Sequence, residues 1–222
     1  MKPDPRRAEL FQALYTCPYK DRKNLNPPRV EGTCEWFTSH RLFQEWLRSD
    51  TASLLWVSAD PGCGKSVLSR YLVDKFLPSA GGMTICYFFF KDGLEDQVSS
   101  TGALCCILRQ IFQQRPATLS HEVLKMFKEG GETLLESFRE LWDIFVTVAL
   151  SYQGGDLVCV MDALDECAGS GRDQLIDSIN HFYSQTPSES SRLKILLTSR
   201  PYMDIKRGFY HLESERPAIH LS

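Results

Sequence analysis

Short apolar runs alternate with helical patterns from residue 51 to the end of the chain. Continuous apolar runs of this length are typical of strands buried on both faces of a parallel sheet. They predict four strands and a weaker fifth at residues 54–58, 83–90, 157–161, 194–198 and 218–221. Apolar residues at helical spacing predict helices at residues 67–76, 101–114, 118–128, 134–150 and 174–184. This alternation indicates successive βαβ units, and hence an α/β three-layer sandwich with helices on both faces of a mainly parallel five-stranded sheet.

The first 50 residues follow a different pattern. Leu10, Phe11 and Leu14 lie at helical spacing and predict a short helix over residues 4–16. A polar connector follows at residues 19–32, and an aromatic-rich helix is predicted at residues 36–48. We therefore divide the chain into a helical lead-in at residues 1–50 and a core domain at residues 51–222. The aromatic side chains of the lead-in either anchor it to the core or bind a partner.

Composition narrows the function classes. With 43% hydrophobic and 24% charged residues, the chain resembles an ordinary globular protein, and its longest apolar runs are shorter than the ~20 residues of a membrane span. The charged, proline-rich N-terminus predicts neither a signal peptide nor a transit peptide, so we expect a soluble, cytoplasmic protein without a membrane partner. A formal charge of −3 provides no long-range basic field for nucleic acid.

The eight cysteines include no CxxC pair and lie mostly in apolar stretches. This pattern favours buried, reduced thiols over disulfides, and together with five dispersed histidines it predicts no structural zinc. Cys63 is different because it lies in a glycine-rich loop, next to a predicted helix N-terminus. Its thiol either fills a variable position or serves as a redox-sensitive group.

The glycine-rich loop after the first predicted strand reads Ala59-Asp60-Pro61-Gly62-Cys63-Gly64-Lys65-Ser66. It matches the Walker A pattern GxxxxGK[ST] at every position but the first, where alanine replaces glycine. The two glycines permit turns that aim N–H groups at phosphate oxygens, and the following helix adds its positive N-terminal end. We expect this loop, extended to Val67, to bind a polyphosphate, with Lys65 on the β- and γ-phosphates and the Ser66 hydroxyl on Mg²⁺.

Acidic residues follow the third predicted strand. Asp162 lies at the carboxyl end of the apolar run 157–161, which is the Walker B position, so it is a candidate Mg²⁺ ligand together with Ser66. Asp165 and Glu166 follow closely. Either carboxylate is a candidate for orienting or deprotonating an attacking water, and the alternative is that they cap the next helix.

A cation follows the fourth predicted strand. Arg200 comes directly after residues 194–198, and ligands of open α/β sheets bind at the carboxyl ends of the strands. We therefore expect Arg200 to face the γ-phosphate and to sense its presence, with a surface ion pair as the alternative.

Taken with these motifs, two further segments resemble the NACHT subgroup of the STAND class of P-loop NTPases. They are DALDEC at residues 162–167 and LLTSRP at residues 196–201. Shorter stretches are similar to fungal, NLR-like members: VEGTCEW at residues 30–36, YFFFKD at 87–92 and GALC at 102–105. The resemblance implies a sheet ordered 5-1-4-3-2 and a small residue after the metal-binding aspartate, here Ala163. It also implies that Arg29 and Val30 lie near the nucleotide base and ribose.

The resemblance also implies a function. Family members are signalling switches in which ATP or GTP with Mg²⁺ favours self-association through NACHT domains and slow hydrolysis resets the switch. It implies helical and winged-helix regions after residue 222, so we expect this chain to be a fragment with weak activity. A nucleotide-binding scaffold that does not hydrolyse is the alternative, and a small-molecule kinase is disfavoured because we find no arginine-rich lid. The choice between ATP and GTP stays open, since no NKxD-type guanine motif is present.

Overall fold

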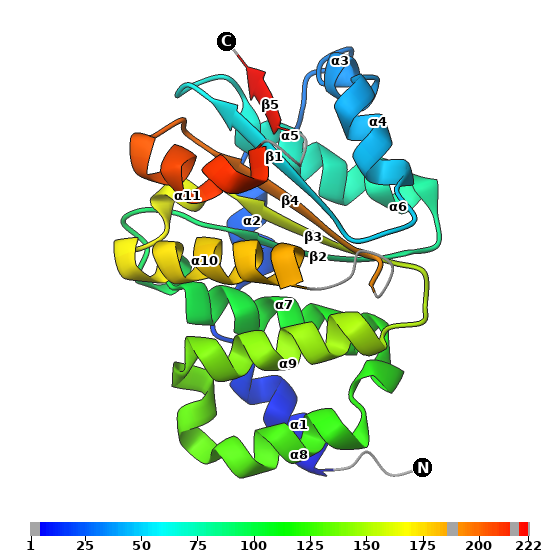
Figure 1. Cartoon of the computed structure of the whole chain (residues 1–222), viewed down its shortest axis with the longest axis vertical. Helices are drawn as coiled ribbons and strands as arrows, with labels where there is room; N and C mark the ends of the chain where they lie inside the picture. Colours follow the sequence, from blue (N-terminus) through cyan, green and yellow to red (C-terminus); the bar gives the residue numbers. More distant parts are fainter. Residues whose placement is uncertain (1–4, 186–190, 214–217, 222) are drawn as a thin grey trace.

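The computed structural model describes residues 5–185, 191–213 and 218–221, and its centre is a twisted five-stranded sheet (Figure 1). The strands are β1 (Ser53–Ala59), β2 (Met83–Phe89), β3 (Asp156–Asp162), β4 (Leu193–Ser199) and β5 (Ala218–Leu221). Their order is β2-β3-β4-β1-β5, and every neighbouring pair is parallel. This confirms the expected order 5-1-4-3-2, and it brings the carboxyl ends of β1, β3 and β4 together at one edge.

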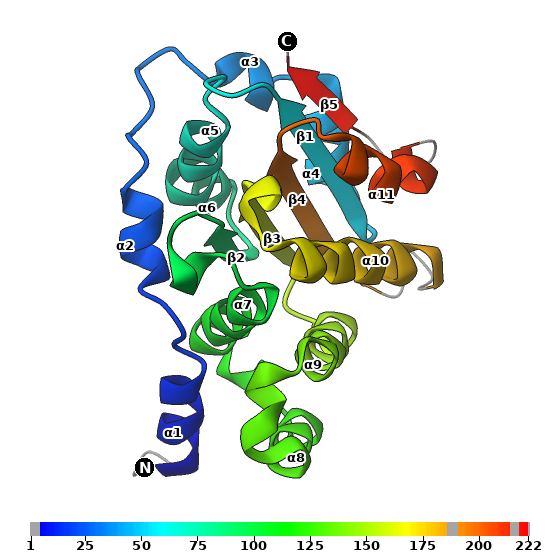
Figure 2. The ribbon, with the colours of Figure 1, turned by 90° about the vertical axis from the view of Figure 1, so that its left-hand side faces the viewer.

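Helices cover both faces of the sheet, as the three-layer prediction required (Figure 2). One face carries α3 (Glu35–Thr38), α4 (Arg41–Arg48), α5 (Lys65–Tyr71), a π-helical turn at Leu72–Phe76, and α6 (Leu77–Ala80). The other carries α7 (Ser100–Gln114), α9 (Phe138–Ser151), α10 (Gly169–Gln185) and α11 (Met203–Glu213), with α8 (His121–Gly130) outside them. The helices α1 (Pro5–Ala13) and α2 (Tyr19–Asn24) run past the β2 side of the sheet. Short 3-10 turns lie at Glu95–Gln97, Pro116–Thr118, Gly131–Glu136 and Leu164–Glu166.

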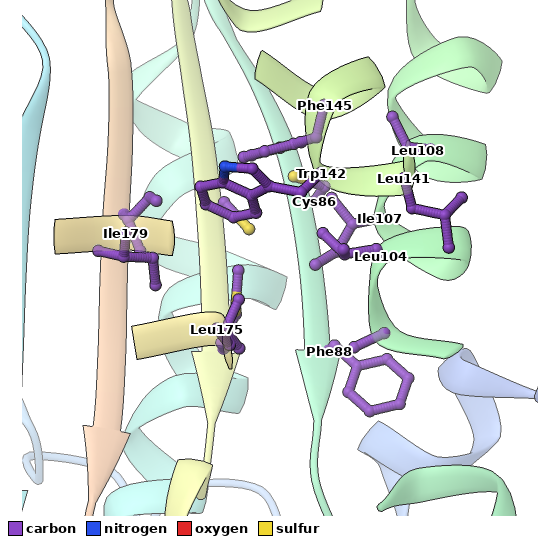
Figure 3. Close-up of a cluster of buried hydrophobic side chains, with 14 of the residues drawn as sticks. Cys86, Phe88, Leu104, Ile107, Leu108, Leu141, Trp142, Phe145, Leu175 and Ile179 are labelled. Carbon is purple, nitrogen blue, oxygen red and sulfur yellow. The ribbon is translucent and has the colours of Figure 1, made fainter. Parts of the chain in front are cut away.

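Two apolar cores hold these layers together. Successive strand residues point to opposite faces of a sheet, so Leu54 and Trp56 join the core under α7, α9 and α10, whereas Leu55 and Val57 join the core under α4 and α5. Figure 3 shows the larger core, in which side chains of β2 meet those of α7, α9 and α10. Burial on both faces explains why the strands appear in the sequence as continuous apolar runs. Within the part of the chain that is described, no helix is both long and apolar enough to cross a membrane.

Several expected helices are confirmed and others need correction. The predicted helix at residues 36–48 is two helices, because Ser39 and His40 interrupt it and the His40 side chain caps α4. The helix after the glycine-rich loop does not stop before Pro78. It continues through the π-helical turn into α6, where Pro78 takes one of the first two positions and needs no intrahelical N–H bond.

Two helices were missed. The polar connector contains α2, whose buried Lys23 pairs with Asp74 of the π-helical turn and whose Arg22 pairs with Asp96 at 2.9 Å. The segment after Arg200 contains α11. Both are held by tertiary contacts rather than by a strong helical sequence pattern, and such contacts often override weak propensity.

Glutamine side chains cover the outer edge of β2. The Gln114 amide accepts from the Ile85 N–H (3.2 Å) and donates to its C=O (2.7 Å), and Gln110 pairs in the same way with Tyr87 (3.1 and 2.8 Å). Gln97 donates to the C=O of Phe89 at 2.6 Å. In a sheet these backbone groups would pair with another strand. Side-chain amides therefore take the place that a further strand would occupy along β2.

Candidate functional site

The glycine-rich loop joins the end of β1 to the start of α5. Gly62 (φ +84°) and Gly64 (φ +78°) adopt left-handed backbone conformations, which glycine reaches without steric cost. Asp60 to Gly64 are exposed, and α5 begins at Lys65. The Lys65 ammonium donates to the carbonyl oxygens of Ala59 (2.6 Å) and Asp60 (3.0 Å), so its charge lies within the loop. The loop thus combines exposed backbone, a helix N-terminus and one cation.

Asp162 lies at the carboxyl end of β3, beside this helix. Its side chain is buried, and its Oδ1 accepts hydrogen bonds of 2.7 Å from Ser69 of α5 and from Thr198 of β4. Burial raises the pKa of Asp162, and hydrogen bonds from Ser66, Ser69 and Thr198 together with the Lys65 charge oppose that rise. The structure therefore brings Asp162 and Ser66 together, at the position expected of a Walker B acid.

A tight turn places the next two acids. Ala163 has a left-handed backbone conformation (φ +56°), and its N–H donates to the Thr198 hydroxyl at 2.9 Å. The 3-10 turn that follows directs Asp165 and Glu166 toward the end of β4. The Cβ of Ala163 makes this conformation cost roughly 1–2 kcal/mol, and a β-branched or bulky residue is a still rarer occupant of it.

Asp165 is a buried anchor for Arg200. Its side chain is only 3% exposed, and its Oδ1 accepts the Arg200 backbone N–H at 2.9 Å. Its Oδ2 lies 3.2 Å from the Nε of Arg200. Arg200 also donates to the Tyr202 hydroxyl at 3.0 Å. The guanidinium thus rests on acids of its own chain at the carboxyl edge of the sheet.

Glu166 opens onto a polar cavity of about 630 Å³. Its Oε2 accepts the Asp92 backbone N–H at 2.9 Å and lies 3.3 Å from the Lys91 ammonium. The Arg200 guanidinium is 3.9 Å from its Oε1. Lys91, Asp92 and Arg200 line the cavity with Asp165 and Glu166, so this hollow next to β3 and β4 is lined by two cations and three carboxylates.

The connector lies further along α5. The Arg29 guanidinium stacks 3.9 Å above the Tyr71 ring and donates to the Thr33 carbonyl at 2.6 Å, while Val30 is 73% exposed. Tyr71 ends α5 and lies about 9 Å along the helix axis from Lys65, at 1.5 Å per residue. The structure therefore joins Arg29 to the glycine-rich-loop helix but not to the loop itself.

Sequence reasoning missed three side chains that shape this site. Ser69 and Thr198 hold the Asp162 carboxylate, and Lys91 holds Glu166. For two of them, Ser69 and Lys91, a sequence feature could have indicated the role. Ser69 lies three residues after Ser66 on the same helix face, and Lys91 follows a parallel strand, whose end must meet the same sheet edge. For Thr198 the sequence had no such feature. Side chains of β4 alternate between the two faces of the sheet, and in a continuous apolar run the sequence does not show which face each residue takes.

The residues present suit Mg²⁺. Hydroxyl and carboxylate oxygens are the ligands this ion prefers, and Ser66 and Asp162 supply one of each near one another. Burial makes the ionised Asp162 costly in the protein alone. A divalent cation would offset that cost, so the donor set fits the ion.

Comparison with known proteins finds some that are similar in sequence and others that are similar in structure. The sequence family described as Nephrocystin 3, N-terminal, matches residues 32–200. The vegetative incompatibility protein HET-E-1 of Podospora anserina is 27% identical over 203 residues, which are 89% of this chain and 14% of that protein. Cdc6p of Pyrobaculum aerophilum has a similar structure (TM-score 0.56, 15% identity) over 89% of this chain and 47% of its own. For the Aeropyrum pernix ORC2 protein the TM-score is 0.45 at 15% identity, with 100% of this chain and 48% of that chain covered.

These relatives agree with the resemblance found in the motifs. The likeness to Cdc6p is one of fold alone, and it matches the parallel sheet with a glycine-rich loop after β1. The matched residues 32–200 include that loop, Asp162 and Arg200, and they make up well over half of the 222 residues. The chain therefore belongs to the Nephrocystin 3 N-terminal family, and it is a NACHT-like domain with the P-loop NTPase fold.

Proposed function

We propose that this domain binds ATP or GTP with Mg²⁺, hydrolyses it slowly and serves as the switch of an NLR-like protein. The observation that carries the proposal is the position of Asp162, buried at the end of β3 and bonded to Ser69 in the second turn of α5. A carboxylate beside a glycine-rich loop is the pairing that a metal–triphosphate complex needs. A glycine-rich turn with a merely structural role would have no use for a buried acid next to it.

The loop supplies the phosphate contacts in this proposal. Its backbone N–H groups and the N-terminus of α5 would bind the phosphate oxygens, and Lys65 would exchange the carbonyls of Ala59 and Asp60 for the β- and γ-phosphates. Hydrogen bonds to charged groups contribute about 1.5–3 kcal/mol each, so several of them support binding in the micromolar range. Bound Mg²⁺, held by Ser66 and Asp162, would neutralise charge on the phosphate oxygens.

Glu166 is the better candidate for the water-activating acid. Asp165 is 3% exposed, and Arg200 occupies both of its oxygens, whereas Glu166 is 17% exposed and faces the cavity. A general base has to reach the water from which it takes a proton. In this mechanism Asp165 positions Arg200, which senses the γ-phosphate, and Glu166 orients and deprotonates the water.

One observation favours the scaffold alternative. The Glu166 carboxylate is already occupied by the Asp92 N–H and by Lys91. If these contacts persist with nucleotide bound, the protein binds the ligand without hydrolysing it. Single-turnover hydrolysis of ATP and GTP separates the two functions. Under the enzyme hypothesis Glu166→Gln slows hydrolysis by about 10²–10⁴-fold, the range of general-base catalysis, and leaves nucleotide affinity almost unchanged. No turnover in either protein favours the scaffold, whereas equal, measurable rates in wild type and variant contradict the role given to Glu166.

A thermal-shift experiment tests nucleotide binding itself. Ligand at 100 times its Kd stabilises a protein by about 2.7 kcal/mol, which is roughly 5–10 °C for a domain of this size. We expect that shift with Mg²⁺–ATP or Mg²⁺–GTP, and we expect Lys65→Ala to abolish it. Lys75→Ala is the matched control, because Lys75 is an exposed lysine of the π-helical turn that follows α5. An undiminished shift in Lys65→Ala would refute the phosphate role.

Other parts of the proposal rest on the family resemblance. The chain spans only 14% of the length of HET-E-1, and in this part of the proposal the switch acts within a longer protein. There we propose that nucleotide binding in the cytoplasm promotes self-association through these domains, with Arg29 and Val30 next to the nucleotide base. Sedimentation of the full-length protein with and without Mg²⁺–ATP tests this. A nucleotide-dependent increase in mass that Lys65→Ala removes is expected, and a constant mass contradicts it.

A further inference from the structure

Two cysteines meet where the lead-in crosses α7. The Cys17 and Cys106 sulfurs are 3.7 Å apart, although 89 positions separate them in the sequence. Thr16, the residue before Cys17, also contacts α7: its hydroxyl oxygen lies 3.2 Å from the Cys106 sulfur and donates a hydrogen bond of 3.0 Å to the Gly102 carbonyl oxygen. Both thiols are buried, but Thr16, which touches Cys106, is exposed. The pair thus lies directly beneath the surface.

We propose that Cys17 and Cys106 are a modification site, which a peroxide oxidises to a disulfide that fastens the lead-in to α7. A disulfide has an S–S length of about 2.05 Å, so the sulfurs must approach by about 1.7 Å. Cys17 lies in irregular backbone between α1 and α2, whereas Cys106 is fixed in the middle of α7. A small shift of the irregular segment closes the distance without moving the helix.

The contacts around Cys106 favour its thiolate, which is the reactive form. Hydrogen bonds with Cys17 and Thr16 lower the pKa of Cys106, and the hydrogen bond with Cys106 raises the pKa of Cys17. The Cys106 thiolate attacks one peroxide oxygen, and hydroxide leaves, which gives a sulfenic acid. Cys17 then attacks that sulfur and releases water. In total two thiols and one hydrogen peroxide give one disulfide and two waters.

Other thiols of the described chain provide internal comparisons. Cys86 and Cys159 are also neighbours, but they lie in register on the paired strands β2 and β3, where the hydrogen-bonded backbones cannot shift. Burial raises the pKa of Cys86 as well. Cys105 adjoins Cys106 in sequence, yet it has no contact of this kind with Cys17, and burial raises its pKa to about 12. The position of Cys17 and Cys106 in the fold, and not the mere nearness of two cysteines, makes them the candidates for disulfide formation.

Peptide mapping tests the proposal. The protein is treated with hydrogen peroxide until exposed Cys63 is oxidised, then alkylated in denaturant and digested with trypsin without reductant. We expect the peptide of residues 8–20 to be joined to that of residues 92–109, with Cys105 alkylated. Its mass should be the sum of the two thiol peptides less two hydrogen atoms, plus the mass added by one alkylation. Cys86 and Cys159 should be recovered as alkylated thiols.

Three variants make the outcome specific. The linked peptide should persist in Cys105→Ser, because Cys105 is in the same tryptic peptide but is not the partner. It should disappear in Cys106→Ser and in Cys17→Ser. A link lost in Cys105→Ser, or Cys17 and Cys106 recovered as free thiols after Cys63 is oxidised, overturns the proposal. Each substitution replaces a buried thiol by a hydroxyl and could therefore affect folding. Circular dichroism before treatment checks that each variant is folded.

Discussion

Asp162 is held in place by hydroxyl groups rather than by a cation. Two bonds of 2.7 Å from Ser69 and Thr198 fix its Oδ1, and Ser69 ties α5 to β3 in doing so. Charge-assisted hydrogen bonds of this kind offset part of the cost of burying a carboxylate. Even so, burial dominates and the pKa of Asp162 is raised. The residue that suits a metal is therefore a source of instability in the protein alone.

Replacement of Asp162 by asparagine should separate stability from function. In Asp162→Asn the amide oxygen still accepts from Ser69 and Thr198, but no buried charge remains, so we expect a higher free energy of unfolding at pH 7 in metal-free buffer. Because the folded-state pKa is raised, the ionised form weakens the native state. The advantage should vanish below about pH 4, the ordinary pKa of aspartic acid, and grow as pH rises through the folded-state pKa.

Urea unfolding at several pH values measures this difference, and a thermal shift with Mg²⁺–nucleotide measures function in the same samples. Asp177→Asn serves as control because Asp177 is exposed on α10. A variant that is less stable than the wild type at pH 7, or one that keeps the full nucleotide shift, would contradict the dual role of Asp162.

The β2 edge shows how a single element is protected. An unpaired strand edge is a template for another strand, and native proteins cover or interrupt such edges. Here α7 presents Gln110 and Gln114 one turn apart, and each amide pairs with both backbone groups of one strand residue. The spacing of four along the helix matches the spacing of two along the strand. The glutamine side chains of α7 therefore match the positions of the backbone groups along the outer edge of β2.

Removal of this cover should cause self-association. In the double variant Gln110→Ala/Gln114→Ala the N–H and C=O groups of Ile85 and Tyr87 lose their partners, and we expect them to pair with the β2 edge of a second molecule. Light scattering should show dimers or larger species that grow with protein concentration. Gln113→Ala is the control, because Gln113 lies on the same helix and bonds to Tyr19 rather than to β2. A monomeric double variant would show that the edge needs no such cover.

Across the whole molecule, the topology gathers the site from segments far apart in the sequence. Parallel strands bring their carboxyl ends to one side, so the glycine-rich loop after β1, Asp162 after β3 and Arg200 after β4 meet there. The lead-in then crosses the β2 side and packs on both α7 and the π-helical turn, through Thr16 and Lys23. The candidate site residues thus lie at the carboxyl ends of the strands, and the lead-in contacts the helical layers on both faces of the sheet.

Much of this was readable from the sequence, and the exceptions have physical reasons. Strands buried on both faces leave continuous apolar runs, and the positions of Lys65, Asp162 and Arg200 after those runs pointed to the candidate site. The helix α11 was missed even though Ile205 and Phe209 lie at helical spacing, because Gly208 weakens the pattern. That glycine has a packing role: a Cβ there would lie 2.7 Å from Ile176 of α10.

Pairings between side chains were not readable. The sequence left Asp165 and Glu166 equivalent, and only the fold shows that Asp165 anchors Arg200 and that Glu166 is the more exposed of the two in the cavity. The strands β2 and β3 end level, at the paired residues Phe89 and Asp162, so the bond between Glu166 and the Asp92 N–H depends on how the two segments that follow them approach each other. Such contacts follow from tertiary geometry, which local patterns do not encode.

The most direct test of the account is a crystal structure of this protein with Mg²⁺ and a non-hydrolysable analogue of ATP or GTP. We predict the phosphates within the loop of residues 59–66, with the metal next to Ser66 and Asp162 and the Lys65 ammonium on the β- and γ-phosphates. Phosphates bound at another edge of the sheet, or a metal remote from Asp162, would contradict the account.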